Sequence, residues 1–186
     1  LDVITFAGNG EPTMHPEFGG IIADTVEMRE KYYPKTGISV LSNGMHISKK
    51  TVFDALKKVD NPILKLDSAF DETVRLIDRP NTPGYSVAKQ VAYYKRFQGN
   101  FVLQTMFLKG TFEGSIIDNT TDKEVSAWIE LVRDLRPREV MIYTIDRETP
   151  GRELEKAPIG ILKEIAERVG QLGIPTVLVE GESLGG

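Results

Sequence analysis

Short apolar runs alternate along the chain with stretches in which apolar residues recur at helical spacing. The runs that predict strands are residues 3–6, 38–41, 63–67, 101–107, 140–144 and 176–179. Most of them are almost continuously apolar, which is typical of parallel strands covered on both faces. We therefore expect a parallel sheet at the centre of the protein.

Five amphipathic stretches lie between these runs and predict helices. Their apolar stripes are Ile21, Thr25, Met28 and Tyr32; Val52, Ala55, Leu56 and Val59; Val87, Val91 and Tyr94; Val125, Trp128, Ile129, Val132 and Leu135; and Leu162, Ala166 and Val169. Ser48 is the expected N-cap of the second helix. Thr121 and Glu124 have capping-box spacing at the start of the fourth, and Pro158 is a favourable first-turn residue for the fifth.

Strand and helix together repeat about every 30 residues, which is the length of a βα unit. The architecture that this predicts is one α/β domain over residues 1–186, built as a partial (βα)6 TIM-like barrel with a parallel sheet. A doubly wound open sheet is the alternative. Irregular loops are expected at residues 110–120 and 147–157. In either architecture ligands bind at the carboxyl ends of the strands.

Composition narrows the class of protein. Apolar residues make up 40% of the chain and charged residues 27%, as in ordinary globular proteins. The formal net charge of −4 argues against extensive, sequence-independent binding of nucleic acid, although a local basic patch is compatible with this charge. No apolar run approaches the length of a bilayer, and we expect a cytoplasmic protein. The chain has no cysteine and two histidines, which disfavours a metal site held by its own side chains.

The first strand leads into a glycine loop, Gly8, Asn9, Gly10, Glu11 and Pro12. Two glycines allow the backbone to turn sharply and to approach a ligand closely. Pro12 restricts Glu11, which places an oriented carboxylate at the sheet edge, suited to a ligand ammonium. A plain glycine turn with a solvated acid explains the spacing equally well. The G-x-G-x-x-G dinucleotide fingerprint is absent.

Polar residues also stand at the ends of the later strands. Ser42 and Asn43 follow the second strand and suit a ribose or a carboxylate, although turn chemistry also explains them. In the third strand, alternation places Lys65 and Asp67 together on the face opposite Leu64 and Leu66. They form either a structural ion pair or part of a binding site, because an unpaired buried charge is costly.

Two further residues complete the candidate set. Gln104 interrupts the apolar run of the fourth strand, and Tyr143 stands at the end of the fifth, where its ring could lie against a flat base. Tyr143 is equally compatible with a place in the core.

These residues, taken in order, resemble the radical-SAM superfamily. The segment F-A-G-N-G-E-P-T at residues 6–13 is similar to that family's "GGEP" element, with Asn9 inserted between the two glycines. The residues of this motif are most similar to those of the Fe–S oxidoreductase branch that includes the wyosine-forming tRNA enzymes. The segments L-K-L-D-S-A at 64–69 and Q-T-M-F-L-K-G at 104–110 are similar to the same branch. The similarity covers most of residues 1–144.

The resemblance implies a partial barrel that binds S-adenosylmethionine (SAM) at its strand ends. It implies that the 8–12 loop holds the methionine amino group. Ser42, Asn43 and Asp67 would then lie near the ribose or carboxylate, with Lys65 beside them. Gln104 and Tyr143 would line the ribose or adenine.

The same resemblance implies a [4Fe–4S] cluster on a CxxxCxxC loop after a first barrel strand, and an electron donor such as flavodoxin or ferredoxin. No such loop is present, so we expect a fragment truncated before the second barrel strand that is inactive alone. Two other functions are compatible with the residues. One is a non-catalytic module that binds a nucleotide or metabolite. The other is an aldolase-type barrel with Lys65 as the Schiff-base nucleophile.

Overall fold

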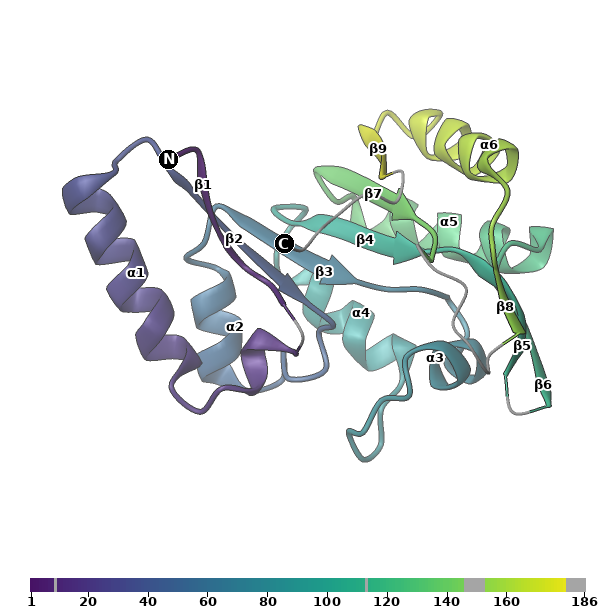
Figure 1. The fold of residues 1–186 in the computed structure, drawn as a ribbon, viewed down its shortest axis with the longest axis horizontal. Coiled ribbons are helices and arrows are strands. Elements are labelled where there is room, and N and C mark those ends of the chain that lie inside the picture. The colour runs from purple at the N-terminus through teal and green to yellow at the C-terminus, as the bar shows by residue number, and fades with distance from the viewer. Residues whose placement is uncertain (9, 113, 146–152, 180–186) are drawn as a thin grey trace.

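An open sheet of six parallel strands forms the centre of the protein (Figure 1). The computed structural model describes residues 1–8, 10–112, 114–145 and 153–179. In spatial order the strands are β1 (Val3–Phe6), β2 (Gly37–Ser42), β3 (Asn61–Lys65), β4 (Val102–Met106), β7 (Glu139–Tyr143) and β9 (Thr176–Val179). Because β1 and β9 lie at opposite edges, the sheet is a partial barrel rather than a closed one, and the predicted α/β fold is confirmed.

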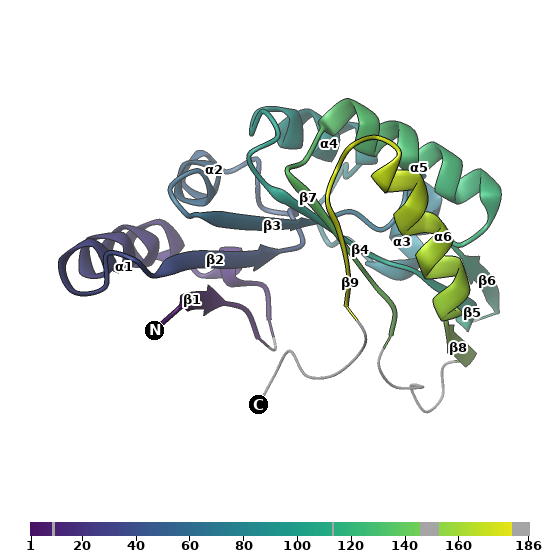
Figure 2. The same cartoon turned by 90° about the horizontal axis from the view of Figure 1, so that it is seen from above.

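Most of the helices lie along the outer, convex face of this curved sheet, and its inner face is left open (Figure 2). These helices are α1 (Phe18–Tyr32), α2 (Lys50–Leu56), α4 (Val87–Lys95), α5 (Asp122–Leu135) and α6 (Ile159–Gly170). Two further helical segments, the 3-10 helix η1 (Pro12–Met14) and α3 (Asp71–Ile77), lie at the carboxyl end of the strands. No helix in the described ranges is both long and apolar enough to cross a bilayer.

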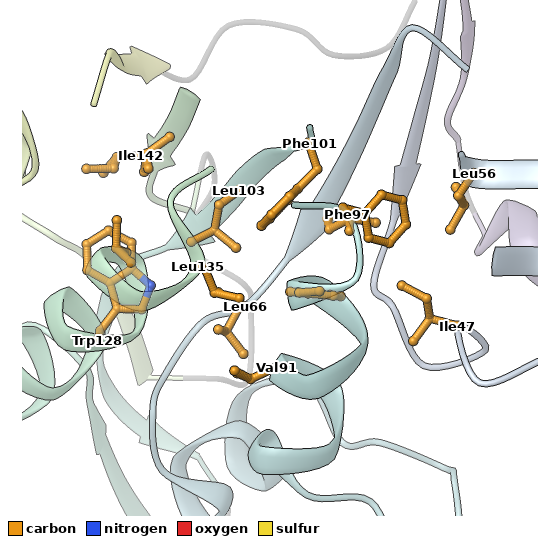
Figure 3. Packing of buried hydrophobic residues seen from close by; sticks show 14 of the residues in the cluster. Ile47, Leu56, Leu66, Val91, Phe97, Phe101, Leu103, Trp128, Leu135 and Ile142 are labelled. Carbon is orange, nitrogen blue, oxygen red and sulfur yellow. The ribbon is translucent and has the colours of Figure 1, made fainter. Parts of the chain in front are cut away.

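Successive side chains along each strand point to opposite faces of the sheet, which explains why one face is buried under the helices and the other is exposed. The outward side chains meet the helices and are completely buried: Ile38, Val40, Leu64, Leu103, Val140 and Ile142. Figure 3 shows part of this core, in which Phe97 and Phe101 lie 6.0 Å apart between ring centroids. The inward residues of the same strands, such as Ile63 and Met141, are half-buried. A ligand can therefore reach only the inner face and the strand ends.

The helix starts agree with the predicted stripes, but one predicted cap is wrong. The Thr121 hydroxyl accepts a hydrogen bond from the Glu124 amide at 3.3 Å, as expected, and Ser86 caps α4 in the same way. Ser48 does not cap α2, whose N-cap is Lys49 with no side-chain hydrogen bond. The helix begins one residue later than the cap spacing required, so the Ser48 hydroxyl does not face its amides.

The predicted strand 63–67 and the predicted loop 110–120 also need correction. The third strand, β3, lies two residues earlier and ends at Lys65, so Asp67 lies beyond it, whereas the run 101–107 contains β4 as expected. A second sheet, antiparallel and three-stranded, is formed by β5 (Leu108–Phe112), β6 (Ser115–Asp118) and β8 (Glu153–Lys156). The chain leaves the large sheet after β4 and enters a hairpin. These strands are short and contain glycine and charged residues, so their composition is typical of a loop. Part of the predicted 147–157 loop is β8, and residues 146–152 lie outside the described ranges.

Replacing Leu103 by alanine should remove a completely buried side chain from the middle of the sheet. We expect the free energy of unfolding to fall by about 2–5 kcal/mol, measured by urea denaturation. The control is Ile116→Ala, since Ile116 is 81% exposed, and it should change stability by no more than about 0.5 kcal/mol. Equal effects of the two substitutions would contradict the assignment of the core.

Candidate functional site at the strand ends

The strands that carry the predicted site residues point their carboxyl ends toward one edge of the parallel sheet, where η1 and α3 also lie (Figure 1). The 8–12 loop follows β1, Ser42 ends β2 and Asn43 follows it, Lys65 ends β3, Gln104 lies in β4 and Tyr143 ends β7. Asn9 lies outside the described residues. Parallel strands bring these residues to one edge although they are far apart in sequence.

The Glu11 carboxylate connects the loop after β1 to the end of β2. It accepts hydrogen bonds from the Ser42 hydroxyl at 2.8 Å and from the Asn43 amide at 2.7 Å. The amide and hydroxyl of Thr13 also donate to it, so Glu11 caps η1 as well. Four protein donors therefore already engage this carboxylate. Its role here is to position the loop.

A cavity of about 540 Å³ lies against this loop and is lined by Phe6, Gly8, Gly10, Met14 and His15 among others. Its volume is within the range of small-molecule sites. The φ of Gly8, +154°, is one that residues with a side chain rarely adopt. The glycine thus allows the loop to turn beside a cavity large enough for a nucleoside-sized ligand.

Lys65 lies between two carboxylates on the inner side of the strand ends. Its ammonium nitrogen is 2.8 Å from Asp67 Oδ2 and 2.6 Å from Asp78 Oδ1. The Asp67 side chain has no exposed surface, and its Oδ1 accepts a hydrogen bond from the Met106 amide at 2.9 Å. The predicted juxtaposition of Lys65 and Asp67 is confirmed. The third member, Asp78, was not predicted, because it follows a helix that the sequence pattern did not indicate.

Burial and charge shift the pKa values of this group. Burial raises the pKa of Asp67 to about 7; the Lys65 ammonium opposes the shift and Asp78 adds to it. Burial lowers the pKa of Lys65, but the two carboxylates outweigh it and the net pKa lies well above its ordinary value. Lys65 is therefore an ammonium at neutral pH. An ammonium is not a nucleophile, so this geometry does not favour the Schiff-base alternative.

Gln104 and Tyr143 face the same inner region from the next two strands. Gln104 is the register partner of Lys65, and Tyr143 is the register partner of Met106. Burial raises the pKa of Tyr143 to about 12, and the Asp67 carboxylate contributes to this shift. The inner face thus carries an ammonium on β3, an amide on β4 and a phenol on β7.

Two residues of α4 hold the strand ends and were not among the predicted site residues. The Gln90 amide nitrogen donates to the Asn43 carbonyl at 3.0 Å and to the Lys65 carbonyl at 3.2 Å, and the Tyr94 hydroxyl donates to the Lys65 carbonyl at 2.7 Å. Gln90 is 5% exposed. In the sequence, Gln90 falls on the same helical face as Val87, Val91 and Tyr94. A glutamine on an apolar helix face must be buried with hydrogen-bond partners, and this could have indicated its role.

Gly44 lies against the same tyrosine. Its φ is +73°, and a Cβ built on it would overlap the Tyr94 hydroxyl. The S-N-G turn therefore requires glycine both for its backbone conformation and for the space that Tyr94 occupies.

Asn119 connects β3, β4 and the small sheet. Its amide nitrogen donates to the carbonyls of Asp67 at 2.8 Å and Met106 at 2.7 Å, and its Oδ1 accepts from the Leu108 amide at 2.8 Å. Nothing in the local pattern distinguishes this asparagine from a turn residue, so the sequence did not indicate it.

Glu124 departs from the capping box that its spacing predicts. Instead of reaching back to its own N-cap, its carboxylate accepts hydrogen bonds from Ser68 and Thr73, both at 2.6 Å. The start of α5 is thereby tied to the segment after β3. In the described residues no group of three histidine or acidic side chains is placed to hold a metal ion.

Curated relatives share parts of this sequence. The chain is 26% identical over 168 residues to the GTPase Obg of Brachyspira hyodysenteriae, a match that covers 84% of this chain and 23% of that protein. It is 28% identical over 160 residues to a UPF0026 protein of Synechocystis, covering 83% of this chain and 55% of that protein. The chain therefore spans about half or less of the length of these relatives. No family model matches it.

Solved structures share the fold. A radical SAM methyltransferase from Sphaerobacter thermophilus has a TM-score of 0.71 at 17% identity, over 96% of this chain and 51% of that one. A domain of the pyruvate-formate lyase-activating enzyme from Bacteroides vulgatus has a TM-score of 0.69 at 14% identity, over 97% and 100%. Streptococcus suis SuiB bound to S-adenosylmethionine has a TM-score of 0.67 at 12% identity, over 96% and 39%. These likenesses establish the fold.

Replacing Glu11 by glutamine should loosen the junction between the 8–12 loop and β2, because an amide nitrogen would face donors that now meet carboxylate oxygens. We expect a loss of about 1–3 kcal/mol of stability and faster hydrogen exchange at the Asn43 amide, measured by NMR. Glu17→Gln, on an exposed side chain, is the matched control and should change neither. Unchanged exchange at Asn43 in the Glu11 variant would contradict this role.

Asp67 should make stability depend on pH in a defined direction. Its pKa is about 7 in the folded protein and near 3.8 when unfolded, so the folded state binds the proton more tightly between these values. The stabilisation is present below the lower value and is lost as the pH rises through the upper one. Asp67→Asn should lack this loss, so its free energy of unfolding should rise relative to wild type from about pH 4 to about pH 7.

The measurement is urea denaturation across that range, with Asp24→Asn, an exposed aspartate of α1, as the control. A difference between Asp67→Asn and wild type that stays constant or falls as the pH rises would show that the Asp67 pKa is not raised.

Proposed function

We propose that this chain is the SAM-binding core of a radical-SAM enzyme. The observation that carries the proposal is that the glycine loop, Lys65, Gln104 and Tyr143 stand on, or directly after, the strands of one parallel sheet that forms a partial barrel. The fold likeness to radical SAM proteins, one of them bound to S-adenosylmethionine, supports it. A non-catalytic module that binds a nucleotide at the same edge is the competing function.

The described residues fit SAM in three respects. The cavity of about 540 Å³ beside the loop is of a suitable size. Backbone groups around Gly8 and Gly10 can approach the methionine amino group, because neither glycine carries a side chain. The Gln104 amide and the Tyr143 phenol offer hydrogen-bond donors to the ribose and a flat ring to the adenine.

The carboxylates in this arrangement support the site without contacting the ligand. Glu11 is engaged by four protein donors, and Asp67 lies below the surface, where it holds Lys65 and the Met106 amide. Ser42 and Asn43 act through Glu11, which keeps the loop and β2 in register. Lys65, whose side chain is 23% exposed, is the charged group that a carboxylate of the ligand could reach.

In the family that the sequence resembles, a reduced [4Fe–4S] cluster cleaves SAM to a 5′-deoxyadenosyl radical, and the cofactors supply that chemistry. None of the 186 residues is a cysteine, so this chain does not fit the cluster through thiolates. We place the cluster ligands in another part of a longer protein. This chain binds and orients SAM and shields it from water.

The remaining assignments follow from the same proposal. The whole protein would act as an oxidoreductase in the cytoplasm and would receive electrons from a flavodoxin or ferredoxin. The net charge of −4 does not favour a nucleic-acid substrate.

Isothermal titration calorimetry with SAM tests the proposal directly. The chain should bind SAM saturably, and Gln104→Leu should weaken binding about tenfold by leaving ligand polar groups unpaired. The matched control is Gln171→Leu, on the exposed C-cap of α6. Absence of saturable binding to the folded chain, or equal weakening by both substitutions, would contradict the proposed site.

Activity gives a separate prediction. Incubated with SAM and dithionite, these 186 residues should release no 5′-deoxyadenosine above a protein-free control, as measured by mass spectrometry. The expected reason is the lack of thiolate ligands for the cluster. Cluster-dependent release of 5′-deoxyadenosine from this chain alone would show that other side chains hold the cluster.

A further inference from the structure

The small antiparallel sheet encloses a cavity that the proposed SAM site does not use. We call it the hairpin cavity. It has a volume of about 150 Å³. Its walls include Leu108, Phe112, Ile117 and Leu154 of the small sheet, Ile77 of α3 and Met106 of β4.

The register of the small sheet explains why this space is open and apolar. Ile117, Gly110 and Leu154 are register partners across β6, β5 and β8, so they form one row. The central member must be glycine, because its φ is +142° and a Cβ there would overlap the Glu153 backbone. No side chain therefore separates the two aliphatic residues that flank it.

Burial within the cavity shows a closed floor and an accessible mouth. Leu108 and Ile117 are 2% and 3% exposed, whereas Phe112 and Leu154 are half-buried. An engineered cavity of about this volume, lined by Leu, Ile and Phe, accepts a benzene molecule in another protein. The cavity is therefore large enough for one aromatic ring.

The side chains at the walls favour an aromatic group over an aliphatic one. The Arg79 guanidinium lies 4.0 Å from the centre of the Phe112 ring, so a flat cation and a ring border the opening. Met106 also lines the cavity. Aromatic rings gain energy from edge-to-face contacts with other rings, from cations over their faces and from thioethers near their edges, and saturated groups lack the π electrons that these contacts require.

The cavity adjoins the proposed SAM site through Met106. The Met106 amide donates to Asp67, and Met106 pairs in register with Tyr143. A ring seated in the cavity would therefore contact Met106, whose backbone neighbours at the strand ends are Asp67 and Tyr143.

We propose that the hairpin cavity binds a single aromatic ring and serves as the anchor for the apolar end of the substrate. The binding of a ring is independent of the SAM assignment, whereas its use as a substrate anchor rests on the proposed function. The cavity at the 8–12 loop shares no lining residue with the hairpin cavity, whereas a cavity of about 490 Å³ against α6 and β9 shares Ile145 with it.

Benzene is the probe, titrated into the chain without SAM and followed through ¹³C-labelled isoleucine δ1-methyl signals by NMR. The signals of Ile77 and Ile117 should shift saturably, and that of Ile116, which is 81% exposed on the outer side of the same hairpin, should not. Cyclohexane should bind more weakly. Leu154→Phe, which fills the mouth, should weaken benzene binding about tenfold, and Ile116→Phe should leave it unchanged.

Unchanged methyl signals of Ile22 and Ile38 in the core establish that the Leu154→Phe variant is folded. If these signals change, Leu76→Phe on α3 serves as the second variant that fills the cavity.

Lack of a saturable shift, equal affinity for cyclohexane, or full benzene binding by a folded filling variant would overturn the proposal. SAM binding is measured on the same samples. Benzene binding without SAM binding would refute the SAM assignment alone, and the reverse would refute the cavity alone.

Discussion

Hydrogen bonds from side chains to the backbone of neighbouring strand ends are the interactions on which the candidate site depends. At this edge the strands stop pairing, and their last amides and carbonyls must find partners where little water enters. Glu11 supplies them for β2, Gln90 for β2 and β3, and Asn119 for β3 and β4. These buried hydrogen bonds therefore fix the backbone that carries Lys65 and its neighbours on the inner face. A site supported in this way is held more precisely than one built on unsupported loops.

Most of the large sheet could be predicted from the sequence because its signal is local. Continuous apolar runs mark β1, β2, β7 and β9 to within one residue, and helical stripes mark the long helices. The small sheet could not be predicted in this way. Its strands are short and polar, and they are stabilised by Asn119 and by pairing with β8, which lies far along the chain.

The candidate site was predictable where neighbours in sequence are neighbours in space. Alternation alone placed Lys65 beside Asp67. Contacts between distant segments could not be predicted from the sequence. Asp78, Gln90 and Glu124 lie near the strand ends because of how the helices and loops pack over them, and the local pattern does not show this packing. For Glu11 the sequence indicated an oriented carboxylate correctly, but not that protein donors occupy it.

The overlap that any side chain at Gly44 would make with Tyr94 has a consequence for how this protein can vary. The glycine and the tyrosine occupy one volume, and the tyrosine hydroxyl also holds the end of β3. Neither residue can be exchanged freely while the other stays. In a set of homologous sequences the two positions should therefore change together or not at all. Such covariation would arise from steric packing between the two residues rather than from a shared role in ligand binding.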